Sequence, residues 1–253
     1  VHITPPAVIC DLALECLPDF VREHGGQITF ASRLSDGDDV LNPIQKSVEV
    51  AGQVHRILQQ GYLFIYFADE RVVVSATTAQ GGEPQTIIGV RSSRNAAAFW
   101  SRWKGYAALH GYLKGRGFFA DGEAISHNRR YTWDDILLPD ATVTTIRTQV
   151  EGFLRHRRKL RDLGVKARRG LILAGPPGTG KTLLGKVLAD TLDASFVWVS
   201  PRHIRNAGSF AEILDVARFV APAVVFLEDL DLFAEERDHR GWMGLGELMN
   251  QLD

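Results

Sequence analysis

The first half of the chain alternates between apolar and polar positions in the manner of β-strands. Residues 62–68 (YLFIYFA) and 71–77 (RVVVSAT) are rich in β-branched and aromatic side chains, and the short polar turn Asp69-Glu70 joins them. This arrangement is typical of a β-hairpin. The other elements with clear periodicity in this half are predicted strands at 27–32 and 85–91 and a predicted helix over 96–113. Together they predict an α+β domain over residues 1–125.

The chain begins with a helical pattern that contains a proline. Residues 8–24 carry apolar side chains at helical spacing, and Pro18 interrupts them. Because proline breaks or kinks a helix, we expect one short helix before it and a second turn or helix that ends at Gly25-Gly26. Cys10 and Cys16 are six residues apart and lie on different helix faces, so we expect free thiols and no disulfide or metal pair.

The second half of the chain alternates strands with helices. The predicted elements are helices at 143–160, 180–192 and 210–220 and strands at 170–174, 196–199 and 223–227. Each strand is apolar along its whole length, which indicates a parallel sheet with helices on both faces and hence an α/β fold. Residues 116–135 lack sustained periodicity and are interpreted as a connector.

A phosphate-binding motif lies between one of these strands and the helix after it. The sequence GPPGTGKT at 175–182 matches G-x-x-x-x-G-K-[ST] at every fixed position. Its glycines let backbone N–H groups converge on an anion, Lys181 can reach the β- and γ-phosphates, and the Thr182 hydroxyl can ligate Mg²⁺. The predicted cofactor is therefore Mg²⁺-ATP in a P-loop fold. The residues predicted to contact it are Gly175, Pro176, Pro177, Gly178, Thr179, Gly180, Lys181, Thr182 and Leu183.

Two carboxylates follow the apolar strand at 223–227. Glu228 and Asp229 come directly after it, in the position where P-loop enzymes hold the metal and polarise the attacking water. A carboxylate pair at the end of a buried strand is a functional-site signal. Glu228, Asp229 and Lys181 are therefore the predicted catalytic residues, and Thr182 and Glu228 the predicted Mg²⁺ ligands.

These two motifs resemble the AAA branch of the AAA+ ATPases, and the resemblance covers residues 131–253. TWDDI at 132–136 looks like the segment that borders the adenine pocket in that family, which implies nucleotide contacts for Asp135 and Ile136. The terminal LMNQLD resembles the helix that follows the second motif. The resemblance implies an incomplete AAA+ large subdomain whose parent protein hydrolyses ATP, forms a ring that is commonly a hexamer, and remodels or translocates a protein client.

The chain departs from the family pattern at the acidic pair. The usual order is Asp then Glu, whereas this chain has Glu228 and then Asp229. By position, Glu228 would serve Mg²⁺ and Asp229 would orient the water. The shorter Asp229 must approach the water more closely or act through a second water. A mitochondrial subfamily that translocates a folded iron–sulfur protein has the same order.

Two further departures concern the channel loop and the end of the chain. The family's threading members carry an aromatic residue where this chain has His203-Ile204-Arg205, so threading is not supported. His203 and Arg205 face either a central channel or solvent. The sensor residue, the arginine fingers and the helical lid are expected beyond Asp253, so we expect the chain to be part of a longer protein.

The predicted organisation has three parts. Residues 1–125 form an N-terminal domain that recruits a client or adaptor, 126–140 form a linker with the adenine-bordering segment, and 141–253 form the ATPase domain. The net charge of −1 gives no support for nucleic acid as a partner, and no apolar run approaches the ~20 residues of a membrane span. The first residues lack a secretory signal, so a cytoplasmic protein is predicted.

Two other functions remain open on the sequence alone. A nucleotide-gated module that assembles and signals with slow or absent hydrolysis would also fit the Glu228-Asp229 order. A nucleic-acid-dependent ATPase is the third hypothesis. The near-neutral charge argues against it, and an exposed helix face explains the basic run at 155–161 better than contact with a phosphate backbone.

Overall fold

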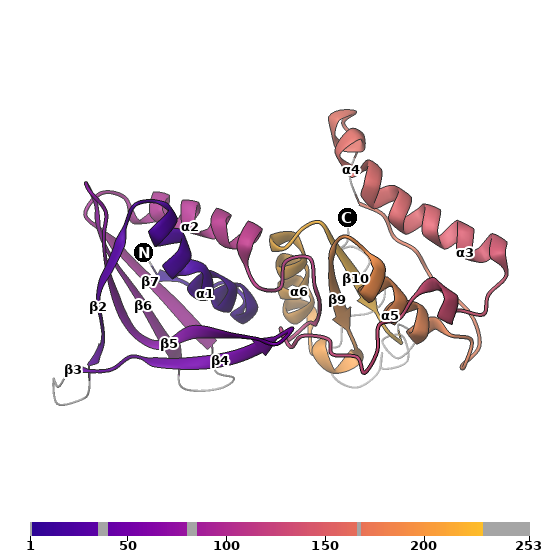
Figure 1. The fold of residues 1–253 in the computed structure, drawn as a ribbon, viewed down its shortest axis with the longest axis horizontal. Coiled ribbons are helices and arrows are strands. Elements are labelled where there is room, and N and C mark those ends of the chain that lie inside the picture. The colour runs from indigo at the N-terminus through magenta and orange to yellow at the C-terminus, as the bar shows by residue number, and fades with distance from the viewer. Residues whose placement is uncertain (1, 35–39, 80–84, 166–167, 230–253) are drawn as a thin grey trace. The chain divides into compact units, whose positions relative to one another are not determined.

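The structure is a computed structural model that describes residues 2–34, 40–79, 85–165 and 168–229. Its contacts divide the chain into two units. The first contains Val1–Lys114 with Ala211–Ala221, and the second contains Gly115–Phe210 with Pro222–Asp253. Figure 1 shows the helices and strands of each unit. The predicted helix at 248–253 lies outside the described residues.

The first unit is built on an antiparallel sheet of seven strands, in the order β1-β7-β6-β5-β2-β3 with β4 paired to β5. The strands are β1 His2–Ile3, β2 Gln27–Leu34, β3 Val40–Leu41, β4 Ile44–Val50, β5 Gln53–Tyr66, β6 Arg71–Ala79 and β7 Gln85–Ser92. The predicted hairpin is confirmed, because β5 and β6 pair with Phe64 opposite Val73. The strands predicted at 27–32 and 85–91 are confirmed as β2 and β7, whereas β4 was not predicted.

Two helices, α1 (Ala7–Glu23) and α2 (Ala96–His110), pack on one face of this sheet (Figure 1). The predicted break at Pro18 is wrong, because α1 runs through it without interruption. Pro18 lies on the exposed side, while ten apolar residues of α1 are buried. Burial of each large side chain contributes about 1.5–3 kcal/mol, and their sum outweighs the ~3 kcal/mol that an internal proline costs.

The α2 helix is confirmed with a shorter C-terminal end than predicted. It begins after Asn95, whose side chain accepts a hydrogen bond from the Ala98 N–H at 3.0 Å, and it ends at His110. The indole N–H of buried Trp103 donates to the Ala13 carbonyl at 2.7 Å and so joins α2 to α1. Cys10 and Cys16 are free and buried, as predicted.

The second unit contains a three-stranded parallel sheet, in the order β10-β9-β8. β9 (Ser195–Val199) and β10 (Ala223–Leu227) confirm two of the predicted strands. β8 (Gly117–Phe119) corrects the interpretation of 116–135 as a connector, since it pairs with β9 along the edge of the sheet. Three residues are too few to show a strand period, so the sequence pattern could not have revealed β8.

The strand predicted at 170–174 is wrong. This segment has no regular secondary structure, and Leu171 and Ile172 are 45% and 78% exposed. Of the residues Leu171, Ile172 and Leu173, only Leu173 packs against the core of the unit. An apolar run becomes a strand only when a neighbour supplies ladder hydrogen bonds, and within the described residues β10 pairs with β9 and not with this segment.

The helices of the second unit are η1 Trp133–Asp135, α3 Asp140–Arg147, the π-helical turn η2 Thr148–Gly152, α4 Phe153–Asp162, α5 Lys181–Thr191 and η3 Pro201–His203. A further helix, α6 Ala207–Phe219, begins in the second unit, and its residues from Ala211 on belong to the first. The predicted helix at 143–160 is thus realised as α3, η2 and α4 in succession, and α5 and α6 are confirmed. The core of the unit consists of Ile146, Leu184, Leu188, Phe196 and Trp198. Within the described ranges, none of the helices combines the length and the apolar character needed to cross a bilayer.

If β8 belongs to the sheet, replacing its buried central side chain must destabilise β9. Phe118 is fully buried, so we expect Phe118→Ala to lower the free energy of opening of the β9 amides by about 3–5 kcal/mol. Native-state hydrogen exchange measures this. Leu137→Ala, at a position that is 97% exposed, is the control and should change little. An equally small effect of both variants would contradict the position of β8.

Candidate functional site

The phosphate loop is a turn held by its own hydrogen bonds. Gly178 and Gly180 have φ angles of 79° and 88°, a left-handed backbone that glycine adopts without steric cost. Gly180 caps the N-terminus of α5, and the Thr179 hydroxyl donates to the Pro176 carbonyl at 2.9 Å. Since the first N–H groups of a helix have no intrahelical acceptor, the start of α5 presents donors and a positive dipole end at this loop.

Lys181 lies over the same loop. Its ammonium donates to the carbonyls of Gly175 and Pro176, at 2.7 and 2.9 Å from Nζ. These bonds fold the side chain back over the turn. The positive charge of Lys181 is therefore held at the loop by two of the loop's own carbonyl groups.

The predicted metal ligands meet across two elements. The hydroxyl of Thr182, in the first turn of α5, donates to Oε1 of Glu228 at 2.7 Å. Glu228 directly follows β10, and its backbone N–H donates to the Val199 carbonyl at 2.9 Å, which extends the β9–β10 ladder by one bond. The second carboxylate oxygen, Oε2, accepts from the Trp198 indole N–H at 3.1 Å.

These two oxygens fit a magnesium ion. Mg²⁺ prefers hard oxygen ligands at 2.0–2.1 Å in octahedral geometry, so neighbouring ligands lie about 3 Å apart. The Thr182 hydroxyl and Glu228 Oε1 are 2.7 Å apart, close to that separation. One carboxylate and one hydroxyl leave most ligand positions for water and for phosphate oxygens, as is usual for this metal.

Asp229 is exposed and adopts an unusual backbone conformation. Its φ is 52°, in the left-handed region, where Asp and Asn occur more readily than other residues with a side chain. Strained backbone conformations concentrate at functional sites. Any substitution that probes Asp229 must tolerate this φ, and asparagine meets that requirement.

The segment at 132–136, predicted to border the adenine, packs against the core cluster that includes residues of α5. Ile136 lies against the same core cluster as Leu184 of α5. The Asp135 carboxylate accepts from the Thr132 N–H at 2.8 Å and from Arg129 at 2.8 Å. The backbone bond and then the Arg129 guanidinium lower the pKa of Asp135, so its charge stabilises this turn.

Two carboxylates that the sequence analysis missed hold this segment in place. Asp190 Oδ2 accepts from the Tyr131 N–H at 2.8 Å and lies 3.3 Å from His127 Nδ1. Glu151, in the π-helical turn, accepts from the Trp133 indole N–H at 2.9 Å. No short-range pattern marks these residues, because the partners of Asp190 lie about 60 residues away in the chain.

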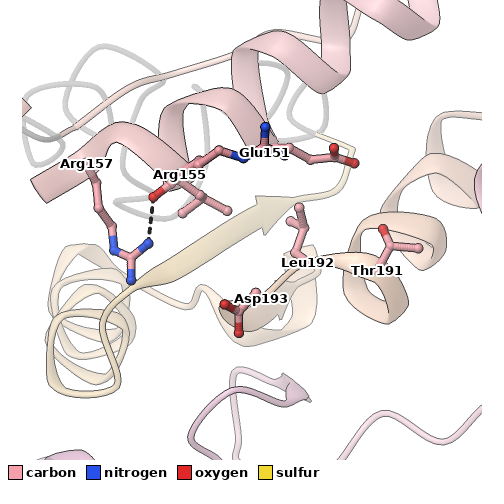
Figure 2. Close-up of a pocket in the computed structure, with 7 residues that line it drawn as sticks. Glu151, Arg155, Arg157, Thr191, Leu192 and Asp193 are labelled. Carbon is pink, nitrogen blue, oxygen red and sulfur yellow. Dashed lines mark hydrogen bonds between the residues drawn. The ribbon is translucent and has the colours of Figure 1, made fainter. Parts of the chain in front are cut away.

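A cavity of about 230 Å³ lies at the opposite end of α5 (Figure 2). Its lining residues are Glu151, Leu154, Arg155, Arg157, Thr191, Leu192 and Asp193. Arg157 Nη1 donates to the Leu154 carbonyl at 2.6 Å, drawn as the dashed line. About three helical turns separate this cavity from the phosphate loop, so it belongs to neither the loop nor the metal ligands.

The loop after β9 is folded around His203. The imidazole Nδ1 accepts from the Ser200 N–H at 3.0 Å, Nε2 lies 3.6 Å from the Asp121 carboxylate, and the side chain is 7% exposed. His203 therefore caps η3 from inside, whereas Arg205 is exposed. Burial lowers the pKa of His203, the Asp121 carboxylate raises it and the Arg202 charge lowers it, and the net shift is downward.

The pKa of His203 provides a test of this buried position. We expect its imidazole to titrate below the ordinary value of about 6.5. Because the unfolded chain then binds the proton first, stability falls as the pH drops from about 6.5 through the lower folded-state pKa. The pH dependence of the His203 ring resonances in NMR measures the pKa directly.

Two variants of the charged neighbours make the His203 test specific. Asp121→Asn removes an opposite charge and should lower the pKa further, whereas Arg202→Gln removes a like charge and should raise it. Shifts of the same sign in both variants would contradict the arrangement.

Comparison with known proteins gives one family and a set of relatives. Residues 171–253, about a third of the chain, match the sequence model of the "ATPase family associated with various cellular activities (AAA)". The chain is similar to Protein CdcH of Halobacterium salinarum, with 32% identity over 137 residues, which are 51% of this chain and 18% of that protein.

Two further relatives carry more informative names. The proteasome-activating nucleotidase of Methanopyrus kandleri is 32% identical over 127 residues, 48% of this chain and 29% of its own length. The peroxisomal ATPase PEX6 of Kluyveromyces lactis is 31% identical over 150 residues, 54% of this chain and 15% of its own length. The chain thus spans less than a third of the length of each of these three relatives.

Proposed function

Because residues 171–253 belong to the AAA family of ATPases, we propose that the chain carries the nucleotide site of an Mg²⁺-dependent ATPase. The observation that carries the proposal is the 2.7 Å hydrogen bond between Thr182 and Glu228. It brings the two residues that we propose as metal ligands together beside the phosphate-loop motif, although 46 residues separate them in the chain.

The residues of the loop would bind and orient the triphosphate. The N–H groups at the start of α5 would donate to phosphate oxygens, and Lys181 would exchange its carbonyl partners for the β- and γ-phosphates. Thr182 and Glu228 would hold Mg²⁺, which when bound neutralises the charge that develops on the phosphates. Asp135 and Ile136 would border the adenine, and their support is the packing of this segment against the core cluster that includes residues of α5.

Asp229 would accept a hydrogen bond from the attacking water and orient it for in-line attack. Its position directly after Glu228 and its left-handed backbone support this role. The second candidate function, a nucleotide-gated module with slow or absent hydrolysis, is favoured by the shorter side chain of aspartate in this role. Turnover by the whole protein distinguishes the two.

We expect Asp229→Asn to reduce ATP turnover by about 100-fold or more with ATP affinity retained, because a water-orienting base contributes that factor. Asparagine keeps the size of the side chain and tolerates the φ of 52°. Both measurements use the whole protein. Phosphate release under multiple turnover gives the turnover rate, and equilibrium ATP binding gives the affinity.

Three variants complete the experiment. Lys181→Met keeps the apolar stem and should lose binding as well as turnover, because a charged donor to phosphate is removed. Lys186→Met, about one turn further along α5, and Asp193→Asn, at its far end, are the matched controls. Undiminished turnover in Asp229→Asn would remove Asp229 from the mechanism. Slow turnover in the wild type, with Mg²⁺-ATP bound, would favour the nucleotide-gated module.

We further propose that the whole protein assembles with copies of itself into a ring, commonly a hexamer in this family, and acts on a protein client recruited by the N-terminal unit. The name of one relative, a proteasome-activating nucleotidase, supports a protein client. The net charge of −1 supports a client other than nucleic acid. The two free cysteines support a cytoplasmic location.

Assembly of the whole protein should depend on nucleotide. We expect its sedimentation coefficient to rise on addition of Mg²⁺-ATP and the rise to be absent in Lys181→Met. Analytical ultracentrifugation measures both. A monomer at all nucleotide concentrations would contradict the ring, and ATP turnover stimulated by DNA would instead favour the nucleic-acid-dependent ATPase.

A further inference from the structure

Trp198 contacts the acidic end of β10 from the neighbouring strand. In the parallel register Trp198 lies opposite Phe226, and Glu228 follows Phe226 by two residues. Because side chains alternate along a strand, these three side chains lie on the same face of the sheet. The indole N–H of Trp198 reaches Glu228 Oε2 at 3.1 Å along that face.

The indole is held rigidly by packing. Trp198 is 5% exposed, and the Phe226 and Phe196 rings lie 4.8 and 6.0 Å from it, centroid to centroid. Gly185 of α5 covers the two rings: a Cβ at this position would lie 2.9 Å from Trp198 and 2.8 Å from Phe226. The helix that begins at the phosphate loop therefore approaches the sheet closely where the indole lies.

The two oxygens of Glu228 thus have separate partners. Oε1 accepts from the Thr182 hydroxyl and Oε2 accepts from the indole. An indole N–H is a donor only, so it cannot compete with the carboxylate for a metal ion. With Oε2 engaged, Oε1 is the oxygen that faces the phosphate loop.

We propose that Trp198 is a positioning residue for the Mg²⁺ site: its indole N–H fixes the glutamate side chain so that Oε1 faces Thr182. This inference rests on the proposed function, since it concerns the same site. Glutamate has one more methylene and one more rotatable bond than aspartate, and the bond to the indole restrains that freedom. Partners that orient a metal ligand typically change metal affinity by about 10- to 100-fold when removed.

A purely structural role for the same bond is the alternative. A buried indole N–H needs an acceptor, and Glu228 is within reach. In that case, loss of the N–H would change stability and leave the response to Mg²⁺ unchanged. The two roles therefore differ in what Trp198→Phe does to metal dependence.

The test is equilibrium ATP binding by the whole protein as a function of Mg²⁺ concentration. Trp198→Phe keeps an aromatic ring in the core and removes the donor. We expect it to raise the Mg²⁺ concentration for half-maximal binding by about tenfold and to leave ATP binding in excess chelator unchanged. Trp103→Phe is the matched control, because it also removes a buried indole bond, to the Ala13 carbonyl at 2.7 Å.

A second background separates positioning from general weakening. In Glu228→Asp the shorter side chain cannot reach both Thr182 and the indole, so adding Trp198→Phe should change the Mg²⁺ response no further. A spectroscopic reading without metal or nucleotide supports the same point. The Trp198 indole N–H resonance should move strongly in Glu228→Asp, while that of Trp103 stays in place.

The outcomes are distinct. Two results of the binding experiment would overturn this inference and leave the proposed function standing. One is a Mg²⁺ dependence of ATP binding that Trp198→Phe does not change. The other is a loss of Mg²⁺ affinity on adding Trp198→Phe that is equally large in the wild-type protein and in Glu228→Asp. A Trp198 indole resonance that does not respond to Glu228→Asp would also overturn it. Absence of Mg²⁺-dependent ATP binding in the wild-type protein would overturn the proposed function and the inference with it.

Discussion

The candidate site depends on the parallel pairing of β9 with β10. Its register places Leu227 opposite Val199, and one further ladder bond, from the Glu228 N–H to the Val199 carbonyl, fixes the residue after the strand. Side chains alternate along a strand, so a slip by one residue would turn the carboxylate to the other face of the sheet. It would then lose both Thr182 and Trp198. One ladder therefore positions the Glu228 carboxylate relative to both its hydroxyl partner, Thr182, and its indole partner, Trp198.

The phosphate loop was predictable because its requirements are local. The left-handed φ angles of Gly178 and Gly180, the helix start and the lysine all lie within eight residues, and each restricts the residue type at its own position. The nearness of Glu228 to the loop was predictable for a related reason, since a carboxylate directly after an apolar strand has few structural explanations. The contact between Thr182 and Glu228 depends, in addition, on how α5 packs against the sheet.

The rest could not be predicted because it depends on partners distant in the chain. The apolar run at 170–174 has the composition of a strand, yet ladder bonds decide whether it becomes one. By contrast, β8 is too short to show the alternating pattern of a strand, yet it becomes one because it forms ladder hydrogen bonds with β9. Pro18 signals a break that the burial of one face of α1 overrides. In the sequence Trp198 looks like any apolar core residue. Only the hydrogen bond from its indole N–H to Glu228 connects it with the candidate site.

The position of β8 matters for anyone who divides this protein into pieces. A boundary drawn where the motif resemblance begins, at Tyr131, would remove β8 and leave the backbone N–H and C=O groups along that side of β9 without their partners. Exposed strand edges pair with other chains and cause aggregation. A shortened protein that starts before Gly117 keeps the edge covered, whereas one that starts at Tyr131 would carry an intact phosphate loop on a sheet prone to self-association.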